Sequence, residues 1–570
     1  MRTRLQNIGK LRERETRHLI GVLVAGKMLG IVTLLGLIKG FAWMLDTAAF
    51  AGPLAETTHQ ANDFVSPINT VWVLVTAFLV FFMQAGFMGL EAGFARSRET
   101  VNIMLECVFD TCLCGLLYWA IGFAFQFGEG NGLIGHHYFF LHGMTKAYGT
   151  TGVAFLAFFL FQFAFADTAS TVTSGAMIGR TSFKGDILYS ACVSGFIYPI
   201  FGHWVWGPGG WLGNTMGWFH GLAGGTVFRD FAGSTVVHTV GGFIALAGAI
   251  VLGPRLGRKF KRDGGGPMPA HDLAVGAIGG VILWFGWYGF NPGSTLSAMD
   301  WPGIGRVAAN TTLAACAGGL VAVFYVYPRT KKWDLGISVN GFLGGLVAIT
   351  CPCYWVSPFG AIMIGAGAGI VVPIGIALLE HWRIDDPIGA WPVHGAAGIW
   401  GTLSLGLFAT GQYGVPTADG SDTSTVVKGL FYGGGTAQLR SQFIGSLTCV
   451  VVVFGVSLII MKVIRSLRGS WNLRISPEGE LEGLDIHEHG TPAYHMEFGQ
   501  GMSYTAPAGL PPQLRTPVGV GAASPPPAPP SSASPSGYSS GPPGASTAFS
   551  SDESPPGGPT SFSSDETPVP

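Results

Sequence analysis

Charged residues are scarce in this sequence: Asp, Glu, Lys and Arg together make up 11% of its 570 residues. A soluble protein carries about 25%, so most of this chain is not suited to face water. The net charge is −1 and no basic domain stands out, which argues against a nucleic-acid partner. Only eight cysteines occur, and the pair Cys351 and Cys353 lacks the further ligands of a zinc site. We therefore expect no metal centre.

Hydrophobic residues, by contrast, reach 48%, and glycine is abundant with 88 residues. Glycine is expected where transmembrane helices pack closely through small side chains. Apolar stretches of membrane length recur along the chain. They predict eleven spans, at residues 70–92, 102–127, 151–177, 186–206, 234–253, 271–292, 304–327, 335–352, 357–380, 391–411 and 441–465. The expected fold class is an all-α polytopic membrane protein, embedded in the lipid bilayer.

The distribution of Lys and Arg predicts how this bundle lies in the membrane. Basic residues gather in alternate connections, as in the loop that holds Arg96 and Arg98, the run 255–262 and the stretch after Arg465. The positive-inside rule places these connections in the cytoplasm. The first span then starts outside and the chain ends in the cytoplasm, which agrees with an odd number of spans. We expect a multi-pass protein of the cytoplasmic (inner) membrane.

The two ends of the chain differ from the membrane domain, which we place at residues 68–467. Residues 1–51 combine a basic leader, an apolar run and an Ala-Phe-Ala ending, the pattern of a secretory signal peptide. An uncleaved N-terminal anchor helix is the alternative. Residues 468–504 are predicted to form a cytoplasmic segment. Residues 505–570 are rich in proline, serine and glycine and cannot bury a core, so we expect a disordered tail.

Two histidines lie inside apolar, glycine-rich runs. Asp230 precedes His238 by eight residues, and Asp386 precedes His394 by the same number. Each Asp is placed to cap a helix. Each His then lies roughly 12 Å along its helix, near the middle of a hydrocarbon core about 30 Å thick. The two helices enter from opposite sides, so the spans predict two inverted five-helix halves plus a C-terminal eleventh helix, with a central pathway at their interface.

Three interpretations of this histidine pair are open. Ionisable residues within a membrane mark functional sites by default, and the matched caps and depths favour one shared pathway. Alternatively, His238 and His394 are unrelated core residues, each bonded to a backbone carbonyl. Thirdly, they are axial ligands of a haem in a redox enzyme, but no second haem pair and no flavin or nicotinamide motif accompanies them. We therefore expect neither an enzyme nor a bound cofactor.

Four motifs carry a resemblance to a known family. They are "FQFAFADTAST", "DFAGSTVVH", "GWYGFNPGS" and "IDDPIGAWPVHGAAGIWG", in that order. With them the chain resembles the ammonium transporter (Amt) family of the Amt/Rhesus superfamily over roughly residues 68–498. The resemblance implies an eleven-helix, pseudo-two-fold bundle that assembles as a homotrimer with one pore in each subunit. It also implies that ammonium or ammonia is carried across the membrane.

The same resemblance assigns roles to individual residues. It implies that His238 and His394 are the twin histidines of the pore. It implies that Phe165 and Phe290 form a stacked outer gate. The external recruitment site for the cation maps to Phe161, Trp206 and Ser294, with the acidic Asp230 beside it. The cytoplasmic segment resembles the family's regulatory C-terminus, where nitrogen-sensing PII-class proteins dock in some members.

These residue types suit ammonium, a compact cation that must shed water to cross. Aromatic faces replace part of that hydration through cation–π attraction, worth up to about 2 kcal/mol when desolvated. Phe161 and Phe165 share a helix face four residues apart, as do Phe290 and Ser294. The serine oxygen can accept a hydrogen bond from the cation, and two imidazoles in contact can share one proton. Without the motif match, core packing is the simpler account of these aromatic residues.

The sequence departs from the family pattern at a few positions. Asp167 stands in the third span where a small apolar residue is expected. It is either a buried acid bonded to neighbouring hydroxyls or an additional proton site. Gly179 stands where the family usually has Glu before Arg180, which weakens an expected cytoplasmic contact. An ammonium sensor of the same fold is the alternative to a transporter, although no kinase or cyclase sequence follows the bundle.

Overall fold

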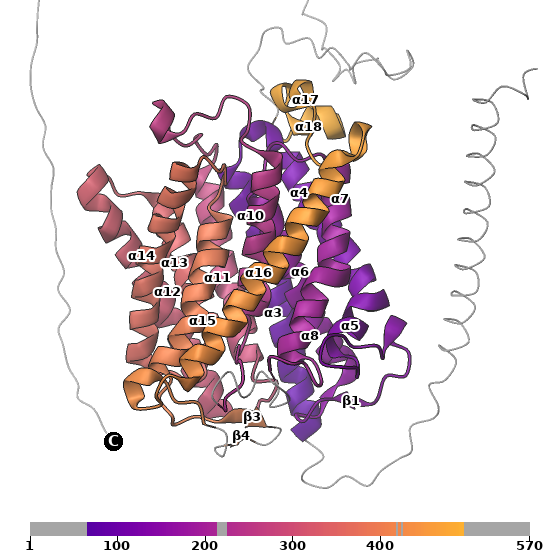
Figure 1. Cartoon of the computed structure of the whole chain (residues 1–570), viewed down its shortest axis with the longest axis vertical. Coiled ribbons are helices and arrows are strands. Elements are labelled where there is room, and N and C mark those ends of the chain that lie inside the picture. The colour runs from indigo at the N-terminus through magenta and orange to yellow at the C-terminus, as the bar shows by residue number, and fades with distance from the viewer. Residues whose placement is uncertain (1–64, 214–224, 418–419, 423–425, 495–570) are drawn as a thin grey trace, which may run out of the picture. The chain divides into compact units, whose positions relative to one another are not determined.

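The computed structural model describes residues 65–213, 225–417, 420–422 and 426–494. The predictions for the N-terminal segment at 1–51 and for the tail at 505–570 lie outside these described residues. Within them, the chain forms a bundle of long helices with two small β-hairpins at one end (Figure 1).

Within the part of the chain that the structure describes, seven long helices are continuous and four spans are composite helices that contain a π-helical turn. The continuous helices are α3 (Val65–Phe94), α6 (Phe155–Gly175), α11 (Leu273–Gly293), α12 (Trp301–Thr330), α13 (Leu335–Thr350), α14 (Pro358–Trp382) and α16 (Ala437–Ser466) among the described residues. The composite helices are α4 (Thr100–Leu117), η3 (Tyr118–Gly122) and α5 (Phe123–Phe127); α7 (Phe183–Cys192), η5 (Val193–Ile197) and α8 (Tyr198–Trp206); η6 (Ser234–Thr239) and α10 (Val240–Leu252); and η8 (Trp391–Ala396) and α15 (Ala397–Phe408).

The remaining elements are short. Strand β1 (Ala147–Tyr148) pairs with β2 (Val153–Ala154), and β3 (Val415–Thr417) pairs with β4 (Gly420–Asp422), both antiparallel. Helices α17 (Pro477–Glu482) and α18 (Leu484–His489) follow the last span. Single 3-10 turns are η2 (Ser97–Glu99), η4 (Phe139–Leu141), η7 (Lys261–Asp263), η10 (Leu430–Tyr432) and η11 (Gly469–Trp471).

The predicted all-α polytopic fold is confirmed, since each of the eleven predicted spans coincides with one of these helices or composite helices. Among the described residues, eight helices have the length and hydropathy to cross a membrane, and α13 is a shorter apolar helix. One boundary is corrected. The third span was predicted to start at residue 151, whereas α6 starts at Phe155. Gly149 and Gly152, with φ of 70° and 68°, turn the chain into the β1–β2 hairpin first.

Close contacts between glycines determine how the first spans of the two predicted halves pack. A Cβ atom on Gly93 of α3 would lie 2.3 Å from the amide nitrogen of Gly276 of α11. A Cβ atom on Gly279 would lie 2.2 Å from the amide nitrogen of Leu90. Small residues permit this approach of two backbones. The third spans of the two predicted halves, α6 and α13, have corresponding neighbours. Helix α6 packs on α3 and α10, the first and fifth spans of its half, and α13 packs on α11 and α15, the first and fifth spans of the other half.

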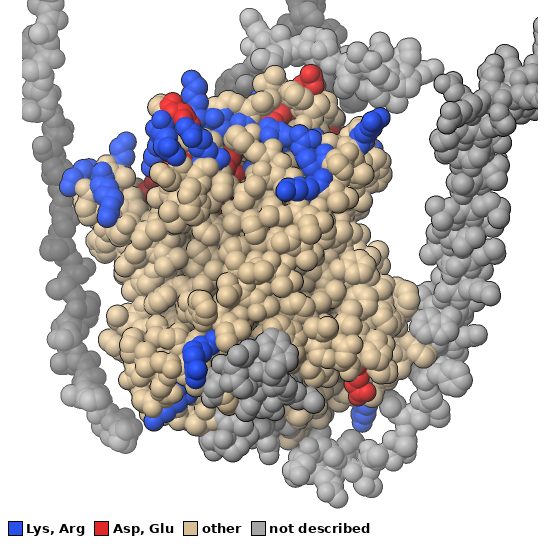
Figure 2. Space-filling model, in the orientation of Figure 1, with Lys and Arg blue, Asp and Glu red and all other residues tan. Residues whose placement is uncertain are grey.

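Charged side chains are concentrated at one end of the bundle. Helix α16 crosses one face of the bundle obliquely, from the end with β3 and β4 to the end with α17 and α18 (Figure 1). Figure 2 shows that Lys and Arg of the described residues gather at the α17 end of this face. A broad uncharged belt separates them from the few charged residues at the opposite end. This pattern is typical of a helix bundle that spans a bilayer.

Candidate functional site

A cavity of about 370 Å³ opens at the end of the bundle that holds β1. Its wall includes Phe161, Phe165, Trp206, Asp230 and Ser294. These residues come from α6, from the end of α8, from the segment before η6 and from the end of α11. The structure therefore brings together in one vestibule all the residues that the resemblance assigned to cation recruitment.

A pair of stacked aromatic rings lies at the base of this vestibule. The ring centroids of Phe165 and Phe290 are 3.9 Å apart, with 19° between the ring planes. Phe161 lies on the other side of Phe165, at a centroid distance of 4.7 Å. All three side chains are buried. A cation that reaches this stack meets aromatic faces, which attract it electrostatically.

Two polar groups are positioned beside the aromatic rings. The indole N–H of Trp206 donates to the backbone carbonyl of Asp230 at 2.7 Å, which fixes the ring against Phe165 at a centroid distance of 6.2 Å. The hydroxyl of Ser294 donates to the carbonyl of Phe290 at 2.8 Å. Because this bond uses the hydroxyl proton, the oxygen of Ser294 is presented to the cavity as an acceptor.

The carboxylate of Asp230 caps the helix that carries His238. One oxygen accepts the backbone N–H groups of Gly233 and Ser234 at 2.9 and 3.0 Å. The other accepts those of Thr235 and Val236 at 2.8 and 2.9 Å. Four N–H donors stabilise the ionised carboxylate. Its charge therefore favours a cation in the vestibule, while its oxygens are already engaged with the backbone.

The two histidines lie directly beyond the phenylalanine stack. The Nδ1 atoms of His238 and His394 are 3.2 Å apart. The imidazole of His238 stacks on Phe290 at 5.3 Å and on Trp287 at 5.1 Å between ring centroids. Both histidines are buried, and Nε2 of His238 has no protein partner among the described residues. In a Nδ1–Nδ1 hydrogen bond one nitrogen donates and the other accepts, so the pair shares one proton.

The second histidine is held by a cap that mirrors the first. The carboxylate of Asp386 accepts the N–H groups of Gly389 and Ala390 at 3.0 Å and of Trp391 at 2.9 Å. Both histidines lie in π-helical turns, η6 and η8, which contact each other. Single π-turns occur frequently at functional sites. The matched Asp–His spacing of the sequence thus corresponds to matched local structures.

Asp167 does not line the vestibule; it lies on the side of α6 that contacts α4. One carboxylate oxygen accepts the hydroxyl of Thr111 at 3.1 Å. The expected partners were the hydroxyls of Thr168, Ser170 and Thr171. Thr168 and Thr171 donate to backbone carbonyls instead, and the hydroxyl of Ser170 has no partner among the described residues. The other oxygen of Asp167 has no partner among the described residues, and the residue is fully buried.

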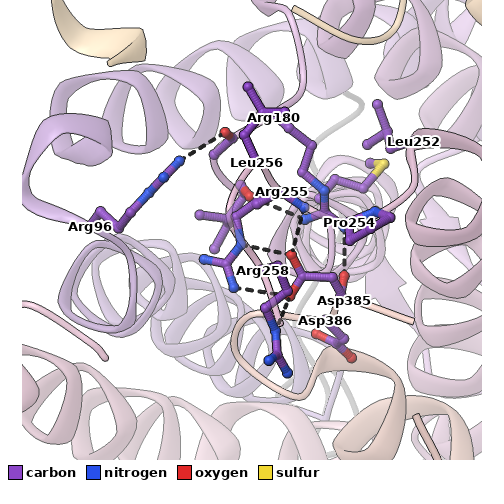
Figure 3. A network of polar contacts seen from close by, with 12 residues as sticks. Arg96, Arg180, Leu252, Pro254, Arg255, Leu256, Arg258, Asp385 and Asp386 are labelled. Atoms are coloured by element: carbon purple, nitrogen blue, oxygen red, sulfur yellow. Dashed lines mark hydrogen bonds and ion pairs between the residues drawn. The ribbon is translucent and has the colours of Figure 1, made fainter. Parts of the chain in front are cut away.

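A network of charged residues lies where α10 ends and shortly before η8 begins, away from the vestibule (Figure 3). Arg255, just after α10, binds both carboxylate oxygens of Asp385 at 2.8 and 3.0 Å. Arg180 donates to the backbone carbonyl of Asp385 at 2.5 Å. Burial opposes ionisation of Asp385, but the bonds from Arg255 and the charge of Arg180 outweigh it and hold the pKa of this carboxyl well below its ordinary value. Burial lowers the pKa of Arg180 to about 10.

The C-terminal segment binds to the same network through Arg474 and Glu480. Glu480 of α17 accepts the N–H of Leu256 at 2.5 Å and pairs with Arg474 at 2.8 Å. Arg474 in turn donates to the carbonyls of Leu252 and Pro254 at 2.5 and 2.9 Å. Since Leu252 is the last residue of α10, the segment is hydrogen-bonded to the end of the composite helix η6–α10, which carries His238. Asp385 precedes the Asp386 cap, so the network reaches both histidine helices.

The departure at Gly179 has a local explanation. A Cβ atom there would lie 2.5 Å from Oε1 of Glu99, and Gly179 has a φ of 80°. Glu99 is buried and forms an ion pair with Arg96, which also donates to the carbonyl of Gly179 at 3.2 Å. The Glu99 carboxylate therefore fills the space beside Gly179.

Sequence reasoning missed several residues around the pathway. Trp287 precedes Phe290 by three residues on α11, so helical spacing would have placed it on the same face. The pairing of Arg255 with Asp385 joins residues 130 positions apart, and no local pattern signals it. Arg474 and Glu480 lie within the predicted cytoplasmic segment, but their attachment to the loop after α10 is a tertiary contact.

Comparison with known proteins agrees with this geometry. The sequence profile of the Ammonium Transporter Family matches residues 71–494. Ammonium transporter Amt2 of Archaeoglobus fulgidus is 42% identical over 453 residues, which cover 79% of this chain and 93% of that protein. Ammonium transporter 1 member 3 of Solanum lycopersicum is 38% identical over 440 residues, covering 75% and 93%.

Solved structures show the same fold. A "Sensor Amt Protein" superposes with a TM-score of 0.65 at 35% identity, covering 75% of this chain and 100% of the other. The crystal structure of Candida albicans Mep2 superposes with a TM-score of 0.64 at 26% identity, covering 74% and 89%. The matched region contains the vestibule, the phenylalanine stack, the paired histidines and the charged network. The chain therefore belongs to the ammonium transporter family.

Proposed function

We propose that this protein transports ammonium across the membrane, releasing its proton so that ammonia crosses the apolar part of the pore. The single observation that supports this most directly is the continuous arrangement of vestibule, stacked Phe165 and Phe290, and paired His238 and His394. The family membership and the names of the relatives point to the same substrate, ammonium or ammonia.

Recruitment is the first step. Trp206 and Phe161 offer aromatic faces to the cation, and the oxygen of Ser294 accepts one of its N–H groups. The charge of Asp230 adds a longer-range attraction, although its oxygens bind backbone N–H groups. Together these groups replace part of the water that ammonium loses in the vestibule.

Proton release and the passage of ammonia follow at the aromatic stack. Beyond Phe165 and Phe290 lie the two imidazoles and the ring of Trp287, all buried or nearly so, and a full charge away from water is costly there. Neutral ammonia can pass between the stacked rings and the histidines. His238 and His394 share one proton, so the pair can accept the proton that ammonium releases and pass another on. The proton thus crosses separately from ammonia, and transport is electrogenic.

A sensor role is the second candidate, and the structural likeness to a "Sensor Amt Protein" is the observation that favours it. In such a role, occupancy of the vestibule would change the position of the C-terminal segment through the Arg255–Asp385 network. A haem between the histidines is disfavoured by geometry. Two axial nitrogens need a separation of about 4 Å, twice a metal–imidazole bond of about 2 Å, whereas these nitrogens are 3.2 Å apart. The protein is thus proposed to act without a cofactor and not as an enzyme.

The placement of the protein follows from its charge distribution. We propose that the α17 end, where Lys and Arg gather, faces the cytoplasm and that the vestibule faces outward in the cytoplasmic membrane (Figure 2). The membrane domain is proposed to assemble as a homotrimer with one pore in each subunit. Residues 468–504 are proposed as a regulatory segment to which a PII-class protein binds.

The experiment that tests the transport proposal is solid-supported-membrane electrophysiology on purified protein in liposomes, with an ammonium pulse. A saturable current that protein-free liposomes lack is expected. Accelerated ammonia-driven pH changes without any current would replace electrogenic transport by a neutral channel. Silence of the folded protein in both assays would favour the sensor role.

A further inference from the structure

A second set of buried polar residues crosses the bundle outside the pore. The composite helices α4–η3–α5 and α7–η5–α8 lie side by side and both run toward the vestibule end. Each carries a polar residue at about every fourth position on the face toward the other. We call these sets the α4 stripe, which is Asn102, Glu106, Asp110, Cys114 and Tyr118, and the α7–α8 stripe, which is Asp186, Ser190, Ser194 and Tyr198. Together they form the polar file.

The two stripes meet level by level. The carboxyl group of Asp110 lies beside the carboxyl group of Asp186 and the hydroxyl of Ser190. One turn further along, the thiol of Cys114 lies beside the hydroxyl of Ser194. The α4 stripe alone, from residue 102 to residue 118, spans about 24 Å, most of a hydrocarbon core about 30 Å thick. Every residue of the polar file is at most 3% exposed.

Many atoms of the polar file lack a well-aligned protein hydrogen bond, although polar groups lie beside them. Within the described residues, both carboxylate oxygens of Asp110, one of Asp186, and the hydroxyl oxygens of Ser190, Ser194 and Tyr198 have no aligned partner. Native proteins leave few buried polar atoms in this state. A consecutive series of them between two helices is a path that protons or bridging water molecules can occupy.

The charges around Asp110 exclude a structural ion pair. The charged groups that act on it are all acids: Asp186 of α7, Glu106 of the same helix and Asp167 of α6. Glu91 of α3 acts on Glu106 from another side. Facing carboxyl groups cannot both be ionised away from water. A proton shared between Asp110 and Asp186 removes this repulsion, and the hydroxyl of Tyr189 donates to Asp186 as well.

The inner end of the polar file reaches the cytoplasmic segment. The side-chain amide of Asn102 donates to Glu106 at 2.8 Å, and its backbone N–H donates to Asp485 of α18 at 2.9 Å. The ring of His489 lies 2.9 Å from the amide oxygen of Asn102. His489 is only partly buried. Polar groups thus lead from Glu106 to the partly buried His489 at the surface.

The outer end reaches the opposite surface. The hydroxyl of Tyr118 donates to Gln126 at 2.8 Å. The ring nitrogens of buried His203 each lie 2.8 Å from a carbonyl oxygen, that of Gln126 for Nδ1 and that of exposed Asn131 for Nε2. His203 thus links the backbone of Gln126 to the exposed Asn131 at the outer end.

We propose that the polar file is a second path across the membrane, which conducts protons without ammonium. Each hydroxyl, thiol or carboxyl group from Tyr118 to Glu106 accepts one proton and gives up another. Water molecules carry the proton past the amides of Gln126 and Asn102 at the two ends, so one proton enters at one end as one leaves at the other. The stripes contact each other through π-helical turns η3 and η5, a feature frequent at functional sites. None of the stripe residues lines the vestibule.

The test measures proton flux through the full-length protein in ammonium-free liposomes. A pH gradient is imposed, valinomycin and potassium hold the voltage at zero, and a trapped pH dye reports the rate. The wild-type protein should dissipate the gradient faster than protein-free liposomes. Asp110→Asn should lower the protein-dependent rate about tenfold or more. The amide can still donate to Asp186, so the fold is preserved while the exchangeable acid is removed. Asp300→Asn, which changes a buried acid that caps α12, should leave the rate unchanged.

Two further variants keep the outcome decisive. Asp110→Glu restores a carboxyl group and should recover most of the rate, whereas Ser194→Ala, a small change, should lower it. If wild-type flux equals that of empty liposomes, or if Asp110→Asn and Ser194→Ala both conduct normally, the second path does not exist. Because no ammonium is present, this result is independent of the ammonium current that tests the transport proposal.

Discussion

The Nδ1 atoms of His238 and His394 lie 3.2 Å apart, although the two residues are 156 positions apart in the chain. Each ring is delivered by its own π-helical turn, and each turn begins close to a capping aspartate. One proton between them leaves Nε2 of His238 without a protein partner among the described residues. The pair is thus a place in the proposed pore where a proton can be exchanged.

Replacing either histidine by alanine removes this shared proton. For His238→Ala and for His394→Ala we expect the ammonium-elicited current to fall about 100-fold, the scale at which positioned proton-transfer groups act. Solid-supported-membrane currents at symmetrical pH measure this, and size-exclusion profiles confirm folding. Undiminished current in both variants would remove the histidines from the proton path.

Trp206 and Trp204 offer a matched pair for testing recruitment. The indole of Trp206 lines the vestibule, whereas that of Trp204, two residues earlier on α8, donates to the carbonyl of Leu133. For Trp206→Leu we expect the half-saturating ammonium concentration to rise about five- to thirtyfold, because cation–π attraction of about 1–2 kcal/mol is lost. Trp204→Leu should keep the wild-type value. The concentration dependence of the current is the measurement, and equal shifts in both variants would contradict a recruiting role.

Variants of the two capping aspartates, Asp230 and Asp386, distinguish a structural role in capping from an electrostatic role in attracting the cation. Asp230→Asn and Asp386→Asn each place an amide nitrogen where a carboxylate oxygen accepted backbone N–H groups, and each should cost about 1–3 kcal/mol of stability. Only Asp230 lines the vestibule. We therefore expect both variants to melt at lower temperature, but only Asp230→Asn to raise the half-saturating ammonium concentration. An unchanged concentration dependence in Asp230→Asn would assign this residue to capping alone.

The sequence predicted those features that local patterns encode. Hydropathy located the spans, and the spacing from Asp230 to His238 and from Asp386 to His394 predicted two buried rings at similar depth, because a cap fixes where each helix begins. The vestibule residues came from motif resemblance. The partners of Asp167 and Asp385 were not predictable, because Thr111 and Arg255 reach them from other helices and loops, and only tertiary packing decides such pairs.

The Arg255–Asp385 pair should be a large contributor to stability at the inner end of the pore. Both side chains are at most 4% exposed, so Asp385→Asn leaves a buried guanidinium without its partner. Removing one member of a buried pair costs about 3–5 kcal/mol. The exposed Arg383–Asp263 pair, linked at 2.6 Å, is the matched control, and Asp263→Asn should not change the melting temperature measurably.

The pH dependence of the same variant tests the sign of this contribution. The folded-state pKa of Asp385 is depressed below its unfolded value of about 3.9. Its contribution is therefore fully present above that value and is lost as the pH falls through the lower, folded-state pKa. The difference in melting temperature between wild type and Asp385→Asn should be constant from about pH 6 to pH 8 and should shrink only in strong acid, below about pH 4. A difference that instead disappeared near neutral pH would mean that Asp385 is not held ionised by Arg255.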